Sequence, residues 1–264
     1  MQVLNRPWGA MHYRVDGPAD APAVVFANSL GTDLRLWDPL LAEMPEIRAI
    51  RFDKRGHGLS DENPPARAGG YRIADLADDA AALIEHLNLG PVIFVGLSIG
   101  GMIAQSLAAR RPDLLSAVVL SNTAVRMGNA ESWAQRIAAI EAGGIGSIAD
   151  TIMERWFAAP FRARPELALW RNMVIRTSTG GYVDACHALA ATDLTETTRG
   201  LDLPALVIAG DQDGSSPPEL VAATAALIPG AAFETIADAG HLPCVEQPPA
   251  YAALLRGFIK EHAA

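Results

Sequence analysis

The ten residues VIFVGLSIGG, at positions 92–101, decide the fold of this 264-residue chain. Their unbroken apolar run, VIFV, is typical of a strand that is covered on both faces of a parallel sheet. A segment of helical period follows, so Ser98 lies on a sharp turn from strand to helix, and Gly96 and Gly100 leave room for that turn. The turn exposes the Ser98 hydroxyl at the carboxyl end of the strand. The stretch therefore predicts a serine nucleophile, the alternative being a glycine-rich turn with an incidental serine.

Apolar runs and segments of helical period alternate along most of the chain. Further runs at residues 24–27, 117–120 and 206–209 indicate buried strands, residues 232–236 indicate a last strand, and helical periods cover residues 76–87 and 102–109. This alternation is typical of the α/β class, with a mostly parallel central sheet and helices on both faces. Residues 11–15 alternate like an exposed antiparallel edge strand, so we expect a mixed sheet.

The alternation of strand and helix breaks off between about residues 123 and 200. Strand-like runs vanish there, and a helical stretch holds eight of the nineteen arginines and three of the five tryptophans, Trp133, Trp156 and Trp170. The strand pattern resumes at Leu203. A single domain of this length is common among α/β folds. We therefore expect a core made of residues 1–122 and 201–264, with residues 123–200 inserted as a helical cap.

Composition and charge exclude several function classes. Thirty acidic side chains against 21 basic ones give a net charge of -9, which would repel a nucleic acid. No apolar run reaches the roughly 18 residues of a membrane span and the first residues lack a leader pattern, so we expect a cytoplasmic protein without a membrane partner. Cys186 and Cys244 are too few for a disulfide framework and lack metal-binding neighbours, which predicts two buried thiols. The oligomeric state is left open, a homo-oligomer included.

A serine hydroxyl needs a general base to become nucleophilic, and six histidines are available. His241 lies in the small-residue loop AGHLP, residues 239–243, after the last expected strand and before the closing helix. That position places His241 above the carboxyl edge of the sheet. His57, in the loop RGHG, is more simply explained as a histidine bonded to the backbone. The other four lie in an expected strand, a helix, the insertion and the tail, so we predict His241 as the base.

Two carboxylates compete for the third position of a catalytic triad. The expected strand at residues 206–209 runs into Asp211-Gln212-Asp213. Asp213 reaches further into the loop, whereas Asp211 can cap the turn. Asp213 is therefore predicted to hold His241 in the right tautomer and to stabilise the imidazolium that forms when Ser98 loses its proton. Asp211 remains the alternative.

Two backbone amides are predicted to bind the oxyanion of an acyl-transfer intermediate. The Ile99 amide begins the helix after Ser98, where the helix dipole favours negative charge. The loop NSLGT, residues 28–32, follows an early central strand and supplies the Leu30 amide as the second donor. Because the contribution is an amide, the Leu30 side chain is free to vary, and a simple apolar loop residue is the alternative.

These motifs resemble those of the α/β-hydrolase superfamily along nearly the whole chain. The resemblance is carried by FDKRGHGLS at residues 52–60, GLSIGG at 96–101, GDQD at 210–213 and GH at 240–241. The order of nucleophile, acid and base along the chain fits it too. Within the superfamily, NSLGT at 28–32 with WD at 37–38, WF at 156–157 and GGY at 180–182 is similar to the 3-oxoadipate enol-lactonases. The resemblance implies a serine hydrolase that opens an anionic enol-lactone with water to give 3-oxoadipate in aromatic acid breakdown, without a metal or organic cofactor.

An anionic lactone that approaches a chain of net charge -9 needs a local cationic surface. Arg126 and Arg136 flank Trp133 near the start of the insertion, and these three residues are predicted to bind substrate, with solvated surface arginines as the alternative. The same triad would serve another ester, thioester or carbon-carbon bond hydrolase, and the fold also supports ligand receptors with slow turnover. Ser98 disfavours a haloalkane dehalogenase, whose nucleophile is an aspartate.

Overall fold

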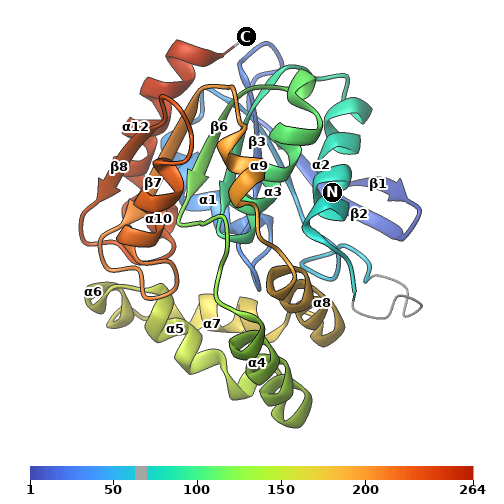
Figure 1. Cartoon of the computed structure of the whole chain (residues 1–264), viewed down its shortest axis with the longest axis vertical. Coiled ribbons are helices and arrows are strands. Elements are labelled where there is room, and N and C mark those ends of the chain that lie inside the picture. Colours follow the sequence, from blue (N-terminus) through green and yellow to red (C-terminus); the bar gives the residue numbers. More distant parts are fainter. Residues whose placement is uncertain (63–69, 264) are drawn as a thin grey trace.

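The computed structural model describes residues 1–62 and 70–263. In this part of the chain, eight strands form one sheet in the order β1-β2-β4-β3-β5-β6-β7-β8 (Figure 1). β2 pairs antiparallel with both β1 and β4, and all the other neighbours are parallel. The strands are β1 (Gln2–Arg6), β2 (Gly9–Asp16), β3 (Ala23–Ala27), β4 (Arg48–Phe52), β5 (Val92–Leu97), β6 (Leu115–Ser121), β7 (Ala205–Gly210) and β8 (Ala232–Ile236).

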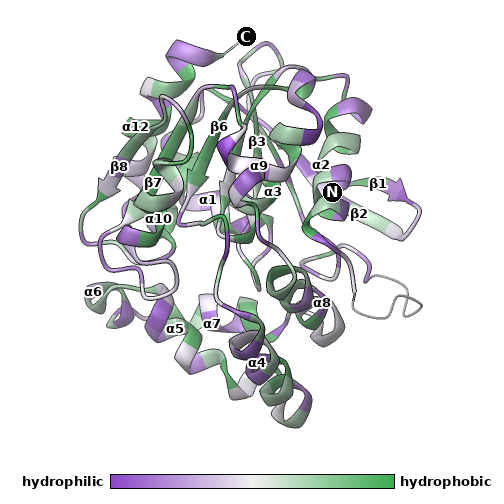
Figure 2. Ribbon diagram, in the orientation of Figure 1, coloured by the Kyte–Doolittle hydropathy of each residue, from purple (hydrophilic) through white to green (hydrophobic). Residues whose placement is uncertain are grey.

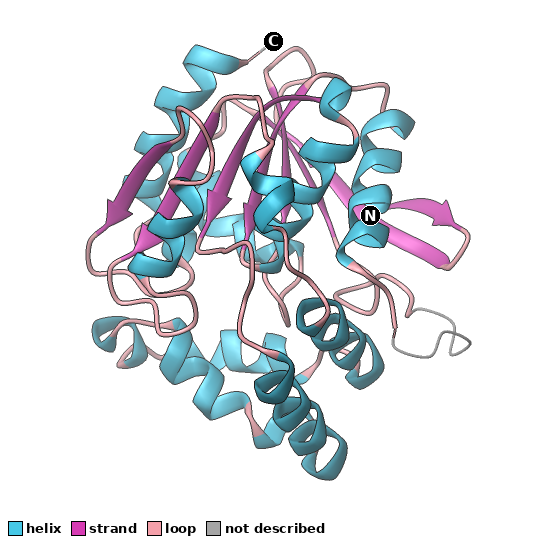
Figure 3. Ribbon diagram, viewed as in Figure 1, coloured by secondary structure: helices cyan, strands magenta, loops and turns pink. Residues whose placement is uncertain are grey.

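Helices cover both faces of this sheet (Figure 3). One face carries α2 (Ile73–His86), α3 (Ile99–Arg110), α9 (Thr195–Arg199) and α10 (Pro218–Ala225), and the other carries α1 (Asp38–Glu43) and α12 (Pro248–His262), with the short α11 (Pro243–Glu246) packed between these two. The predicted α/β class, with a mostly parallel sheet between helices, is confirmed.

The central strands owe their place to their apolar sequences. β5 and β7 are buried at every position, and β3 and β6 at all but one position each. Figure 2 shows these strands in the green of hydrophobic residues, whereas the purple hydrophilic residues lie mostly toward the outside of the molecule. Burying such side chains stabilises the fold by about 25 cal/mol for each square ångström of apolar surface removed from water. The strands predicted at residues 24–27, 92–95, 117–120, 206–209 and 232–236 are all present.

The predicted edge position of residues 11–15 is wrong. These residues lie in β2, antiparallel as expected, but β1 pairs along their outer side, with Gln2 opposite Tyr13 and Arg6 opposite Gly9. Met11 and Tyr13 are buried, so the alternation in β2 marks a strand with one face on the core. β1 is largely exposed and consequently carries little hydrophobic pattern, which is why the sequence does not reveal the true edge.

β4 lies beside β3 near the middle of the sheet, although two arginines interrupt its apolar pattern. The Arg51 side chain is buried, and its guanidinium contacts Asp16 Oδ2 and Asp38 Oδ1, each at 2.5 Å, and the Leu34 carbonyl oxygen at 3.0 Å. A buried cation is tolerated when it is paired and hydrogen-bonded in this way. Hydrophobic patterning is blind to such a strand, because the strand depends on partners far away in the sequence.

Between β6 and β7 the chain forms a layer of helices at the carboxyl ends of the parallel strands (Figure 1). The helices of this layer are α4 (Ala130–Gly143), α5 (Ala149–Trp156), α6 (Ala159–Arg162), α7 (Leu167–Ile175) and α8 (Thr179–Ala190). α9, which follows, packs against α3 of the core. The segment is helical as the sequence indicates, and its extent as one cap unit, residues 123–200, stays a prediction.

The loop after β4 and the start of α8 meet backbone to backbone. A Cβ atom added at Gly56 would lie 2.3 Å from the Gly181 Cα, and one added at Gly181 would lie 2.4 Å from the Gly56 Cα. Gly56 also has a φ of +66°, a conformation that favours glycine. The Tyr71 hydroxyl donates to the Gly181 carbonyl at 3.3 Å. The helical layer is therefore seated directly on the core at this point.

Two expectations from composition concern the cysteines and the membrane. Cys186 and Cys244 are buried free thiols, as predicted, and burial raises the pKa of Cys186 to about 12. A helix long and apolar enough to cross a membrane is absent from residues 1–62 and 70–263.

The seating of the cap predicts that Gly181→Ala destabilises the fold. The added methyl group would press on the backbone at Gly56, and overpacking of this kind costs about 1–3 kcal/mol of unfolding free energy. Gly146→Ala is the matched control, because a Cβ there meets nothing within 4 Å. Urea unfolding of the two variants measures the difference. Equal stabilities would show that cap and core are not in contact here.

Candidate active site

Ser98 sits in a strained turn between β5 and α3, with φ 60° and ψ -119°. Residues with a side chain rarely adopt positive φ, and the surroundings must hold them there. A Cβ on Gly96 would lie 2.1 Å from the Gly100 carbonyl oxygen, and one on Gly100 would lie 2.1 Å from the Ala27 carbonyl oxygen. Larger residues at either position would force the turn apart. The glycines therefore leave the room that the sequence predicts.

Two hydrogen bonds fix the Ser98 backbone to the end of β6. The Ser98 amide donates to the Ser121 carbonyl at 2.9 Å, and the Thr123 hydroxyl donates to the Ser98 carbonyl at 2.7 Å. The serine side chain thus projects from a rigid backbone at the carboxyl edge of the sheet.

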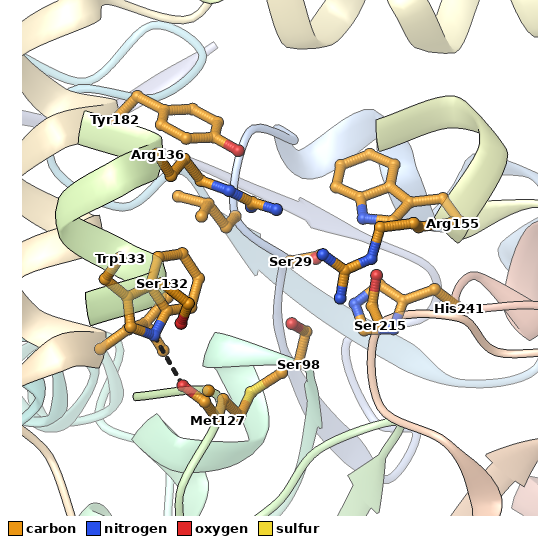
Figure 4. A pocket seen from close by; sticks show the side chains of 14 residues that line it. Ser29, Ser98, Met127, Ser132, Trp133, Arg136, Arg155, Tyr182, Ser215 and His241 are labelled. Atoms are coloured by element: carbon orange, nitrogen blue, oxygen red, sulfur yellow. Dashed lines mark hydrogen bonds between the residues drawn. The ribbon is translucent and has the colours of Figure 1, made fainter. Parts of the chain in front are cut away.

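His241 and Asp213 form a buried pair at the same edge. His241 Nδ1 lies 2.8 Å from Asp213 Oδ2, and each residue exposes less than a twentieth of its surface. The His241 amide donates to the Trp156 carbonyl at 2.7 Å, and its imidazole stacks on the Trp156 ring with centroids 6.0 Å apart. Among the described residues, Ser98 Oγ makes no hydrogen bond to His241, although both side chains line one cavity (Figure 4). The geometry leaves His241 Nε2 as the ring nitrogen that is not held by Asp213.

The Asp213 carboxylate accepts hydrogen bonds on both oxygens. Oδ1 accepts from the Ser215 and Ser216 amides at 2.7 and 3.0 Å, and Oδ2 accepts from Asn122 Nδ2 and Ser216 Oγ, each at 2.9 Å. Burial acts to raise the pKa of Asp213, but the charge of His241 and hydrogen bonds from His241, Asn122 and the Ser216 amide outweigh it and lower the pKa. Asp213 is therefore held ionised although it is buried.

Asp211 points elsewhere. It is exposed, and its Oδ1 accepts a hydrogen bond from the Ala239 amide at 3.2 Å. The structure thus brings Asp213 and not Asp211 to His241. His57 bonds to the backbone as expected, with Nδ1 3.0 Å from the Arg55 carbonyl oxygen.

The amides of Leu30 and Ile99 are available for a ligand. Leu30 lies in the loop after β3 and lines the cavity, and Ile99 is the first residue of α3. Within the described part of the chain, neither amide donates to another protein group. Free amides at a helix start and in a neighbouring loop are suited to an anion.

The cavity has a volume of about 330 Å³, and its walls come both from loops at the edge of the sheet and from the helical layer. Its lining residues are Ser29, Leu30, Ser98, Met127, Gly128, Ser132, Trp133, Arg136, Arg155, Trp156, Tyr182, Leu189, Ser215 and His241. In Figure 4 the Arg136 and Arg155 side chains enter from opposite sides, above the Ser98 hydroxyl. This size suits a small molecule.

Both arginines keep an unpaired charge in the cavity. Arg136 lies with its Cζ 5.1 Å from the centre of the Trp133 ring, and Trp133 is itself held by a 2.6 Å hydrogen bond from its Nε1 to the Met127 carbonyl. Arg155 Nε donates to the Gly214 carbonyl at 3.0 Å. Burial and the charge of Arg136 lower the pKa of Arg155. No carboxylate of the described residues forms an ion pair with either guanidinium, so the pair is free to receive an anion.

The predicted cap residues divide between the cavity and the surface. Trp133 and Arg136 line the cavity, whereas Arg126 is exposed and lies outside the lining. Arg155 also lines the cavity and was not predicted from the sequence. The one available signal was its position directly before Trp156, in a motif noted only for its resemblance.

Three further polar residues were missed. Asn122 and Ser216 hold Asp213, and Glu246 accepts from the Gly240 amide at 2.7 Å and from the Ala158 amide at 2.8 Å. Burial raises the pKa of Glu246 to about 7. Glu246 thus ties the loop of His241 to the chain that leaves α5. Clusters of three or more His, Cys, Asp or Glu that could hold a metal ion are absent from residues 1–62 and 70–263.

Comparison with known proteins agrees with this geometry. Residues 22–248 match the model of the alpha/beta hydrolase fold family. The chain is 35% identical to 3-oxoadipate enol-lactonase 2 of Acinetobacter baylyi over 95% of this chain and 93% of that protein, and 31% identical to 3-oxoadipate enol-lactonase 1 of the same organism over 98% and 97%. The crystal structure of the enol-lactonase from Burkholderia xenovorans superposes with a TM-score of 0.92 at 35% identity, over 98% of this chain and 100% of that one. These matches confirm the resemblance seen in the motifs. The chain belongs to the alpha/beta hydrolase fold family.

Proposed function

We propose that this chain opens the ring of 3-oxoadipate enol-lactone with water to give 3-oxoadipate. The observation that carries the proposal is that two guanidinium groups without an ion-pair partner among the described residues, Arg136 and Arg155, line the cavity together with Ser98 and His241. Such a cavity suits a small ester that bears a carboxylate. The similarity to proteins named 3-oxoadipate enol-lactonases supports the same substrate.

In the proposed reaction, Ser98 Oγ attacks the lactone carbonyl carbon while His241 Nε2 takes its proton. Asp213 accepts the hydrogen bond from His241 Nδ1–H and stabilises the imidazolium. The amides of Leu30 and Ile99 bind the oxyanion, whose stabilisation is commonly the largest single contribution to catalysis. When the ring carbon–oxygen bond breaks, His241 returns the proton to the enol oxygen, and the opened chain stays esterified to Ser98. Water, activated by His241, then releases the product as its enol, which becomes 3-oxoadipate when the enol proton moves from oxygen to carbon.

The negative net charge of the chain means that an anionic substrate needs a local positive charge in order to bind, and Arg136 and Arg155 supply it. A net charge of -9 repels an anion at long range, whereas two cations inside a partly closed cavity attract it at short range. Trp133 adds a flat apolar wall beside Arg136. We propose that the substrate carboxylate binds between Arg136 and Arg155, which leaves the lactone carbonyl to Ser98. Arg126 is not included in the proposed site because it lies outside the cavity.

A second candidate is hydrolysis of another small carboxylic ester. The chain is 29% identical to a thermophilic esterase from Thermogutta terrifontis, whose malate-bound structure superposes with a TM-score of 0.91. The same triad would serve such an ester.

We further propose a cytoplasmic role in aromatic acid breakdown, with residues 123–200 acting as the cap over the site.

Ser98→Ala and His241→Ala are each expected to lower kcat by roughly 10⁴-fold, and the double variant is expected to lose little more. The reason is that nucleophile and base act in one step, so removing either disables both. Turnover of p-nitrophenyl acetate measures the effect, with circular dichroism as the control for folding. Losses that multiply in the double variant would show that the two residues do not act together.

Asp213→Asn is expected to be severe and Asp211→Asn mild. The amide at position 213 would hold His241 in the wrong tautomer, which in triads of this kind lowers kcat by roughly 10⁴-fold. Asp211 only bonds to the Ala239 amide, so its replacement leaves the base in place. Steady-state kinetics of both variants provide the comparison, and the reverse order of severity would assign the acid to Asp211.

Arg136→Met and Arg155→Met are each expected to lower kcat/KM for the enol-lactone by roughly 10- to 150-fold, because a charge-assisted contact contributes about 1.5–3 kcal/mol. Turnover of a neutral ester is expected to change much less. Arg126→Met is the matched control, since it removes the same charge outside the cavity. If the ratio of anionic to neutral turnover stays the same in both cavity variants, the arginines do not bind the carboxylate, and the proposal narrows to an ester hydrolase of another substrate.

A further inference from the structure

A buried ammonium group lies beneath the loop that carries Leu30. Lys54 follows β4 and exposes 3% of its surface, whereas Lys260, the other lysine of the chain, is exposed in α12. Lys54 Nζ donates to the Ser29 carbonyl at 2.6 Å and to the Thr32 carbonyl at 3.3 Å. It therefore holds the loop from Ser29 to Thr32 from the core side.

We propose that Lys54 is a positioning residue that orients and polarises the Leu30 amide for the oxyanion. The Ser29 carbonyl and the Leu30 N–H belong to one peptide group, and in a trans peptide they point in opposite directions. The described chain has no cis peptide bond. Because the carbonyl is drawn inward to Lys54, the N–H faces the other way, and Ser29, Leu30 and Ser98 all line the cavity. The inference rests on the proposed oxyanion role of Leu30.

The charge of Lys54 adds to its geometric effect. A cation 2.6 Å from a carbonyl oxygen draws electron density from the peptide group, so the N–H at the other end becomes a stronger donor. Hydrogen bonds in such chains strengthen one another by about 10–30% each. The Leu30 amide is left without a protein acceptor among the described residues, so this added strength is available to a ligand.

The nearby carboxylates do not take up this charge. Asp53 uses its oxygens for the Leu34 and Leu59 amides, at 2.7 and 3.0 Å, and for His12 Nδ1 at 2.8 Å, while Asp33 pairs with Arg35. No ion pair of Lys54 is formed within the described residues. A buried cation with no carboxylate in contact is costly for the fold, and its two hydrogen-bond partners are both carbonyls of the oxyanion loop.

The protonation of Lys54 sets the conditions for a test. Burial lowers its pKa to about 7, against the opposing charges of Asp53 and Asp33. His57 also faces Lys54, and burial and the charge of Lys54 lower the pKa of His57 well below its usual range. Lys54 is therefore largely charged at pH 6, where the measurements are made.

The test compares two inhibitors of Lys54→Met at pH 6. A trifluoromethyl ketone bonds to Ser98 Oγ and forms an oxyanion, whereas a non-reactive carboxylate such as succinate fills the cavity without one. Removing an oxyanion donor outright costs roughly 10²- to 10³-fold, so a weakened donor is expected to lower affinity for the ketone by about 10-fold or more. Affinity for succinate is expected to stay within about twofold, because that ligand needs no oxyanion contact.

Two further variants complete the experiment. Lys260→Met removes the exposed lysine and is expected to leave both affinities unchanged. If Lys54→Met does not fold, Lys54→Gln, which keeps a donor but loses the charge, takes its place with the same expected direction. An unchanged ketone affinity in a folded variant would overturn the proposal, and an equal loss for both inhibitors would reduce Lys54 to a structural role and overturn it too. A ketone that fails to inhibit the unmodified enzyme through Ser98 would overturn the proposed function as well.

Discussion

The site depends on the positive φ of Ser98, which the turn can hold only because Gly96 and Gly100, two residues away on either side, leave room for the backbone. A non-glycine residue in such a conformation costs of order 1–3 kcal/mol, and surrounding packing must offset that cost. Here the offset comes from α3, which is buried along nearly all its length between the sheet and its neighbours. Ser98 therefore has its backbone in the hydrophobic core and its side chain in the cavity. Loops from β3, β6 and β7 meet it at one edge because parallel strands all end there.

Charge is distributed across the site in a definite order. Asp213 lies deepest, kept ionised by Asn122, Ser216 and His241. Arg136 and Arg155 lie above the serine, and in an acidic chain they make a local region of positive potential. The negative charge of Asp213 is thus buried against the His241 imidazole, whereas the positive charges of Arg136 and Arg155 face the cavity. A low-dielectric cavity strengthens both interactions relative to water.

Sequence patterns predicted those parts of the fold and site that depend on local residues. The buried strands follow from unbroken apolar runs, the turn at Ser98 follows from its glycines, and the loop at His241 follows from its place after β8. The edge strand β1 and the arginine-bearing strand β4 were not predicted. β1 is largely exposed and β4 is held in part by ion pairs, so neither strand has a clear hydrophobic pattern.

Residues whose role depends on distant partners were beyond such patterns. Asn122 is an ordinary loop asparagine until the fold brings it to Asp213, 91 residues later. Glu246 and Arg155 are similar cases, because each bonds to a residue far away in the sequence. Glu246 accepts from the Ala158 amide, and Arg155 donates to the Gly214 carbonyl. Arg126 and Arg136 could not be told apart from the sequence. Arg126 lies in the loop before α4 and is exposed, whereas Arg136 lies on the side of α4 that lines the cavity.

The carbonyl of Trp156 is both the end of α5 and the acceptor for the His241 amide, while Glu246 joins Gly240 to Ala158. The wall of the cavity and the support of His241 are consequently one piece of backbone. Substitutions that move the backbone at Trp156 therefore shift the imidazole as well, so at this one residue the shape of the cavity and the position of His241 change together. Divergence toward new substrates would be easier at α4 and α8, whose residues line the cavity and, among the described residues, form no hydrogen bond to His241.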